Sequence, residues 1–163
     1  MKFKKFKENV EKWARVRGIY DESTEAHQQA KALEEIGEYL TAETDDERMD
    51  AIGDIAVCIV NAAKLDDSMR PLEFNLWGYG DSELSEVGGY VIDGNYESAL
   101  SSLADYALSE GRDILGCLEQ AWNEIKDRKG MMIDGKYVKW ENLTGEQREE
   151  FERRDHANTL IRQ

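Results

Sequence analysis

The sequence predicts an all-α protein folded as an antiparallel helical bundle, and three observations support this prediction. Most of the 163-residue chain carries apolar side chains at intervals of three and four residues, which is the period of a helix with one buried face. The whole chain contains a single proline, Pro71. Because 40% of the residues are hydrophobic, the chain can bury a substantial core, and we expect one domain over residues 1–163.

The apolar period and the helix-capping residues place the predicted helices. We expect helices over residues 3–17, 24–42, 46–65, 97–109 and 111–129. Ser23 or Thr24 is a candidate cap for the second helix, and Asp45 or Asp46 for the third. Side-chain oxygens at these positions can accept hydrogen bonds from the free amides of a first helical turn.

The remaining segments do not follow the helical period. Residues 66–95 are expected to form a long irregular insertion, because glycines cluster there and the period fails. Asp134 and Gly135 lie between β-prone residues, which predicts a small C-terminal β-hairpin or arm. The charged tail over residues 144–163 opens with a capping-box pattern and is expected to form a peripheral helix.

Charge and composition argue against several classes of function. Lys and Arg number 21 against 35 Asp and Glu, and the net charge of −14 disfavours binding to a nucleic-acid backbone. No apolar stretch approaches the ~20 residues of a membrane span, and no apolar signal segment follows the N-terminus. We therefore expect a cytoplasmic protein, in the host cytoplasm if it is viral, without membrane or nucleic-acid partners. Cys58 and Cys117 fit reduced core thiols.

One face of the second predicted helix collects polar side chains. At 100° per residue, Gln28, Lys31, Glu35 and Glu38 fall within one stripe. Exposed acids on an amphipathic helix are usually only a solvated face. The opposite side is expected to pack inward, and it carries Ala26, Ala30, Leu33, Ile36, Gly37 and Leu40.

The third predicted helix is apolar nearly all round, yet Asp50, Asp54 and Asn61 align on one side of it. A carboxylate on a buried helix needs a partner, because an unpaired charge in a low dielectric is strongly penalised. Gly37 and Gly53 lie in the middle of the two helices, and we expect them to permit a close approach.

Antiparallel packing of these two helices would set Glu35 and Glu38 opposite Asp50 and Asp54. Magnesium prefers oxygen ligands, and manganese is also possible. The four carboxylates therefore predict a site for a divalent cation.

Three stretches carry a resemblance to a known family. They are KALEEIGEYL, then DAIGDIAVCIVN, then AWNEIKDRKG followed by MIDGKYVK. On these residues the chain resembles the all-α nucleotide pyrophosphohydrolases of the MazG type, particularly the single-domain forms carried by bacteriophages. The resemblance covers roughly residues 10–65 and 112–140. It implies the fold of the all-α NTP pyrophosphatases and a homodimer or homotetramer. It also implies cleavage of a nucleoside triphosphate between its α and β phosphates.

The first metal motif of that family has two glutamates three residues apart, which Glu35 and Glu38 match. Glu34 stands where the family often has a leading acid. The resemblance implies that these residues are metal ligands. Glu35 or Glu38 is the candidate general base, and the sequence does not choose between them.

The second metal motif departs from the family pattern of a glutamate and an aspartate three residues apart. Ala51 lies three residues before Asp54, so Asp50 is the natural replacement. Glu47 and Asp50 fit the spacing literally. We favour Asp50 and Asp54, because the apolar run that follows the family aspartate begins after Asp54.

The resemblance also implies residues that contact the substrate. Lys31 faces the phosphates or pairs with Glu35 as an ordinary helical bridge, and Trp13 is a base contact or a core anchor. The Met131–Met132 pair and the hairpin after it are expected to reach another subunit. The candidate substrate contacts are Lys31, Gln28, Asn61, Asn123, Lys126, Arg128 and Trp13.

Other functions remain open from the sequence. The same scaffold resembles all-α dUTP hydrolases and phosphoribosyl-ATP pyrophosphohydrolases, so base and sugar preference are undecided. A chain of this acidity is also compatible with a non-enzymatic module that occupies the nucleic-acid groove of another protein.

Overall fold

The structure is a computed structural model that describes residues 1–66, 72–73 and 80–160. The described chain is all-α with one small hairpin, as predicted. Its helices are α1 (Phe3–Val16), α2 (Ile19–Glu22), α3 (Glu25–Thr41), α4 (Asp45–Leu65), α5 (Leu84–Ile92), α6 (Tyr96–Ser109), α7 (Ile114–Ile125) and α8 (Gly145–Leu160). Strands β1 (Gly130–Ile133) and β2 (Lys136–Lys139) pair antiparallel, and the 3-10 helix η1 (Trp140–Asn142) follows them. None of the described helices combines the length and the apolar character needed to cross a membrane.

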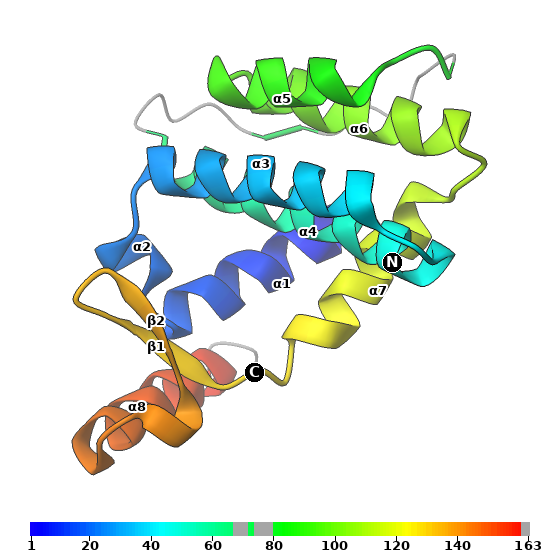
Figure 1. Cartoon of the computed structure of the whole chain (residues 1–163). Coiled ribbons are helices and arrows are strands. Elements are labelled where there is room, and N and C mark those ends of the chain that lie inside the picture. The colour runs from blue at the N-terminus through cyan, green and yellow to red at the C-terminus, as the bar shows by residue number, and fades with distance from the viewer. Residues whose placement is uncertain (67–71, 74–79, 161–163) are drawn as a thin grey trace.

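Helix α4 is the centre of the bundle. Helix α3 runs beside it, with α5 and α6 on one side of this pair and α1 and α7 on the other (Figure 1). Eleven residues of α4 are buried, including Cys58, which like Cys117 is a free thiol as predicted. A Cβ added to Gly53 would lie 2.5 Å from Ala121 Cβ, so Gly53 does permit a close approach, but its partner is α7. The same expectation for Gly37 is wrong, because nothing lies within 4 Å of a Cβ there.

The face of α3 that packs inward is not the one predicted. Helix α4 lies against the side that carries Gln28, Ala32 and Tyr39, and these residues are buried. Among the described elements, α5 covers part of the apolar side, and Leu40 there stays 71% exposed. The prediction of a wholly buried apolar face is therefore wrong. Ile36 is half-buried, whereas the exposed residues are Ala26, Ala30, Leu33, Gly37 and Leu40.

The prediction of an irregular insertion over residues 66–95 is wrong for Leu84–Ile92, because these residues form helix α5. A capping box between Glu83 and Glu86 begins this helix, and Leu84, Val87 and Val91 are buried in the core. Gly88 and its neighbour interrupt the apolar period, but Gly88 lies where α5 packs on α3, with Leu33 Cδ2 3.4 Å from the position of an added Cβ. Residues 67–71 and 74–79 of the predicted insertion lie outside the described residues.

Side chains cap the starts of α3, α4 and α7, but the capping residue and the first residue of the helix are not always the predicted ones. Thr24 caps α3 as predicted, by accepting a hydrogen bond from His27 N. The cap of α4 is Thr44 and not Asp45 or Asp46, because Thr44 and Glu47 form a reciprocal capping box. Helix α7 begins later than predicted, at Ile114, because the side chain of Asp113 caps it.

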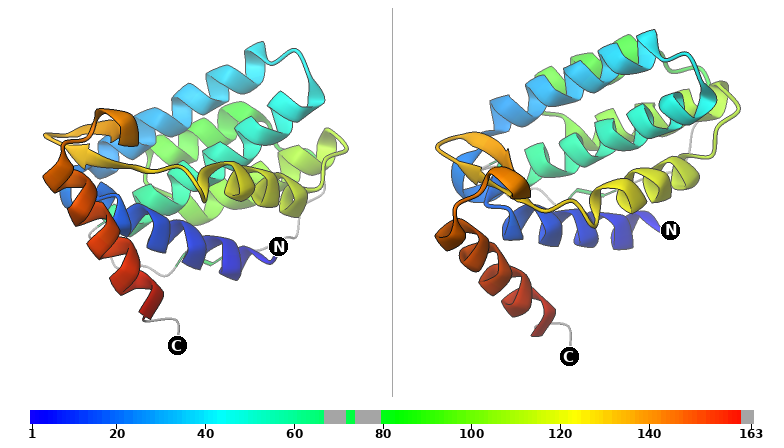
Figure 2. Two further views of the ribbon diagram at one scale, coloured as in Figure 1. Left: turned by 90° about the horizontal axis from the view of Figure 1, so that it is seen from below. Right: turned by 60° about the horizontal axis from the view of Figure 1, so that its bottom comes forward.

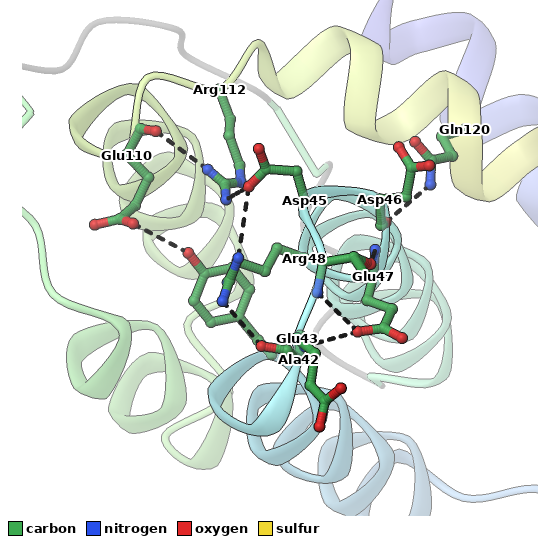
Figure 3. Close-up of polar contacts among 11 residues, drawn as sticks. Ala42, Glu43, Asp45, Asp46, Glu47, Arg48, Glu110, Arg112 and Gln120 are labelled. Atoms are coloured by element: carbon green, nitrogen blue, oxygen red, sulfur yellow. Dashed lines mark hydrogen bonds and ion pairs between the residues drawn. The ribbon is translucent and has the colours of Figure 1, made fainter.

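A network of polar contacts holds the turn between α3 and α4, and we call residues 42–48 the clamped turn (Figure 3). Arg112, from the connection between α6 and α7, donates to Asp45 Oδ1 at 2.9 Å. Arg48 lies 3.5 Å from the same oxygen and donates to Ala42 O at 2.9 Å. Gln120 of α7 donates to Asp46 O at 3.0 Å. These contacts tie the start of α4 to the end of α3, to α7 and to the connection before α7.

The predicted hairpin is confirmed. Asp134 and Gly135 have φ values of 49° and 75°, as a two-residue turn of this kind requires. Met131 packs with Phe151 of α8, and Met132 packs with Ile19 of α2. The expectation that this methionine pair reaches another subunit is wrong, because both side chains are buried within the chain. The tail forms α8 as predicted, and α8 extends away from the bundle (Figure 2).

Candidate functional site

Helices α3 and α4 bring four predicted carboxylates together, and we call Glu35, Glu38, Asp50 and Asp54 the carboxylate cluster. The pKa of Glu35 is raised to about 7, mainly by burial and next by the charge of Asp54. The pKa of Asp54 is also raised to about 7. Burial is the largest cause, and the charge of Asp50 is the second largest. The charged forms of Glu35 and Asp54 are therefore destabilised by desolvation and by neighbouring carboxylates. The cluster holds more negative charge than its surroundings compensate.

Asp50 shows this lack of compensation most directly. Its Oδ1 atom is buried and has no hydrogen-bond partner. The pKa of Asp50 is raised. Burial is the largest cause, and the charge of Glu124 on α7 is the second largest. The sequence analysis missed Glu124 as a neighbour of the cluster. The one available signal is that Glu124 lies four residues before Arg128, on the same side of the predicted helix.

A pocket of about 440 Å³ opens beside the cluster. Along α4 its lining runs from Asp54 through Val57 and Cys58 to Asn61, a distance of about two helical turns. One end of the pocket is therefore acidic, and the other carries an amide. The volume lies within the range of about 300–1,000 Å³ that is usual for small-molecule sites.

Two predicted cations lie in the pocket lining. Lys31 of α3 lines it, and its Nζ is 3.7 Å from Glu34 Oε2. Arg128 also lines it, and its charge lowers the pKa of both Asp50 and Asp54. Arg128 thus offsets part of the negative charge of the cluster.

The backbone that carries Arg128 is held from α1. Arg17 is 4% exposed, and its Nε and Nη2 atoms both donate to Arg128 O, the Nε atom at 3.0 Å. Burial lowers the pKa of Arg17 to about 10. Trp13 donates from Nε1 to Ile125 O at 2.8 Å. Trp13 therefore anchors the end of α7 as well as lining the pocket.

Other predicted site residues lie outside the pocket lining. Glu34 is 68% exposed and pairs with Lys31. Lys126 donates to Asn123 Oδ1 at 2.8 Å, and both are exposed. Glu38 is exposed as well, but its charge raises the pKa of both Asp50 and Asp54. The structure thus places Glu38 at the edge of the site.

Gln28 and Asn61 are buried polar residues of the pocket lining, at 6% and 2% exposure. The hairpin adds lining residues that the sequence analysis did not assign, among them Lys136 and Tyr137. The hairpin is held to the bundle where Gly135 N donates to Glu22 Oε2 at 3.0 Å. These contacts close one side of the pocket.

The carboxylate cluster fits a hard divalent cation in donor type and in charge. Its ligands are all oxygens, and Asp50 Oδ1 lacks a partner. Among residues 1–66, 72–73 and 80–160, however, no three side chains of His, Cys, Asp or Glu form a group that could hold a metal ion as they stand. A cation would therefore have to draw these side chains together.

Comparison of the chain with protein-family models, with curated proteins and with solved structures finds no match in any of the three. Function is therefore inferred from the site itself and from the motifs that carry the resemblance.

Proposed function

We propose that the protein is a divalent-cation-dependent nucleoside triphosphate pyrophosphohydrolase with the fold of the all-α NTP pyrophosphatases. The observation that carries the proposal is the pocket, which joins the carboxylates of Glu35 and Asp54, three cationic side chains and two buried amides in one lining. A nucleotide needs all three, because its phosphates are anionic, its metal ion is cationic and its base carries hydrogen-bonding edges. The order of the MazG-type motifs supports the same conclusion.

Magnesium is the proposed cation, with manganese as a possible substitute. Glu35, Glu38, Asp50 and Asp54 are the residues that would hold it, with Glu34 as an outer acid. When bound, the metal neutralises phosphate oxygens and lowers the pKa of a water molecule.

Residues of the chain account for the remaining steps. Lys31 and Arg128 attract and orient the phosphate oxygens. Glu35 is the proposed general base, because it lines the pocket and Glu38 does not. The oxygen of the attacking water bonds to the α-phosphorus, and its proton passes to Glu35. The bond from the α-phosphorus to the bridging oxygen then breaks, and its electron pair leaves with pyrophosphate.

Product analysis by phosphorus NMR tests this function. The protein is incubated with magnesium and a panel of ribo- and deoxyribonucleoside triphosphates, beside the Asp54→Asn variant. We expect monophosphate and pyrophosphate from the wild type alone, and a preference for dUTP would identify a dUTPase-like enzyme. Orthophosphate as the product would contradict the assigned bond cleavage. No turnover of any nucleotide would favour an acidic protein-interaction module. Light scattering after size exclusion tests the homodimer or homotetramer that the resemblance implies.

A further inference from the structure

Two buried amides line the end of the pocket away from the carboxylates, and each has one atom already bound. Tyr20 donates from its hydroxyl to Asn61 Oδ1 at 2.8 Å. Gln28 donates from Nε2 to Ser23 Oγ at 3.0 Å. Asn61 therefore has its acceptor occupied, and Gln28 has one of its donors occupied.

The atoms left over remain open to a ligand. Within the described residues, Asn61 Nδ2 and Gln28 Oε1 have no hydrogen-bond partner. The only buried side-chain atoms without a partner there are Asp50 Oδ1 and Arg112 Nε. The two free amide atoms are therefore not sealed in the protein, and both residues line the pocket. The pocket offers a donor from Asn61 and an acceptor from Gln28.

Tyr20 decides which way the Asn61 amide faces. Tyr20 is not part of the pocket lining, although its hydroxyl contacts Asn61, which is. Burial raises the pKa of Tyr20, which keeps its hydroxyl protonated and able to donate. A rotated amide would place Nδ2 against this hydroxyl and direct an acceptor into the pocket. In the structure the hydroxyl donates to Oδ1, which leaves Nδ2 as the amide atom available to the pocket.

We propose that Tyr20 is a positioning residue that fixes Asn61 as a donor toward the pocket. The pocket then selects a nucleotide whose base presents an oxygen acceptor at this point over one that presents an amino group. The nucleotide class of the ligand rests on the function proposed above, whereas the orientation of the amide rests on the contact with Tyr20. Tyr20 itself does not touch the ligand.

Matched pairs of nucleotides test this selection. Uridine and cytidine monophosphates differ by an oxygen in place of an amino group, as do inosine and adenosine monophosphates. Calorimetry with magnesium measures the binding of all four to the wild type, Tyr20→Phe and Asn61→Asp. Tyr96→Phe is the matched control, because Tyr96 is a buried tyrosine whose hydroxyl bonds to Glu25 and Gln29 outside the pocket.

We expect the wild type and Tyr96→Phe to bind the oxygen-bearing member of at least one pair more tightly, by about tenfold for one hydrogen bond. Tyr20→Phe should bring this ratio toward one, and in turnover of the triphosphates the change should appear in KM more than in kcat. Asn61→Asp keeps an acceptor for Tyr20 but presents an acceptor to the pocket, so it should reverse the preference.

The failures of the two proposals are distinguishable. Binding of the monophosphates with the same ratio in the wild type and Tyr20→Phe would overturn the role of Tyr20 and leave the proposed function standing. A wild type that does not discriminate within either pair would do the same. Absence of both binding and turnover for every nucleotide would overturn both proposals.

Discussion

Two acidic regions of α4 lie less than two turns apart and differ in every physical respect. In the clamped turn, backbone amides of Thr44 and Glu43 bind the Glu47 carboxylate and lower its pKa. Asp45 in that turn is paired with two arginines. In the carboxylate cluster, burial raises the pKa of Asp50 and Asp54 instead. The same residue types on one helix therefore serve different purposes.

The difference comes from what surrounds each carboxylate. The first turn of a helix presents free amides and a positive dipole end, so an acid there stabilises the fold. One turn later the amides are used within the helix, and α3 and α7 add Glu35 and Glu124 where a counterion would be needed. The clamped turn positions the helices, and the cluster is left with charge that a cation can satisfy.

The largest effect that separates the two regions is expected in catalysis. Asp54→Asn should reduce kcat/KM for nucleoside triphosphate hydrolysis by at least about 100-fold, because it removes a proposed ligand from the cluster. Asp46→Asn is the matched control on the same helix, since the contact of Asp46 to α7 uses its backbone oxygen. Steady-state kinetics with pyrophosphate detection measures both. An equal loss of kcat/KM in both variants would mean that the carboxylate cluster and the clamped turn do not differ in function.

The second effect is on the stability of the metal-free protein. The pKa of Asp54 rises from 3.8 to about 7 on folding, so between these pH values the folded protein holds a proton that the unfolded chain has lost. Stability should fall as pH rises through this window and stay low above it. At pH 8, Asp54→Asn and Glu35→Gln should therefore stabilise the protein by on the order of 2 kcal/mol, or roughly 4–8 °C in Tm. Thermal melts in a chelator from pH 4 to pH 8 check the sign, and a wild type that gains stability over this range would refute it.

Magnesium should reverse this destabilisation. At ten times its Kd, magnesium should raise the Tm of the wild type at pH 8 by about 3–6 °C through mass action. The increase should be smaller at pH 6, because protons compete for Glu35 and Asp54. Asp54→Asn should lose the shift and Asp46→Asn should keep it. Equal shifts in both variants would place the cation elsewhere.

The smallest effect is expected at Glu47. Its pKa is lowered in the folded state, so its charge adds stability above the ordinary pKa of a glutamate and loses that contribution as pH falls. Glu47→Gln should therefore lower the Tm slightly at pH 7, opposite in sign to Asp54→Asn, and match the wild type in strong acid. Melts of both proteins at pH 7 and pH 3 measure the difference. A higher Tm for Glu47→Gln than for the wild type at pH 7 would mean that the carboxylates of both regions destabilise the folded protein.

The sequence alone predicted much of this arrangement. The helical period predicted α1, α3, α4 and α6 close to their observed bounds, and the turn residues Asp134 and Gly135 predicted the hairpin. The helical period also singled out Asp50, Asp54 and Asn61, because polar residues aligned on an apolar helix need a reason. In the structure Glu47 belongs to the capping box of α4, whereas Asp54 lines the pocket.

Other features could not be read from local pattern. The spacing of apolar residues shows that a helix has two faces, but the packing of neighbouring helices decides which face is buried. In this protein α4 buries the side of α3 that carries Gln28. The glycines of α5 lowered its local signal, although Gly88 serves close packing. Met131 was expected to reach another subunit, whereas it packs with Phe151, which lies 20 residues further along the chain.

The sequence by itself thus determined where helices form and which of them carry the acids, because these properties depend on residues within a few turns of one another. Only the tertiary structure decided which acids are paired, which face encloses the pocket, and how Tyr20 and Arg17 hold Asn61 and Arg128. These contacts join residues 41 and 111 positions apart. Desolvation and pairing depend on such neighbours, so the electrostatics of the site exist only once the chain is folded.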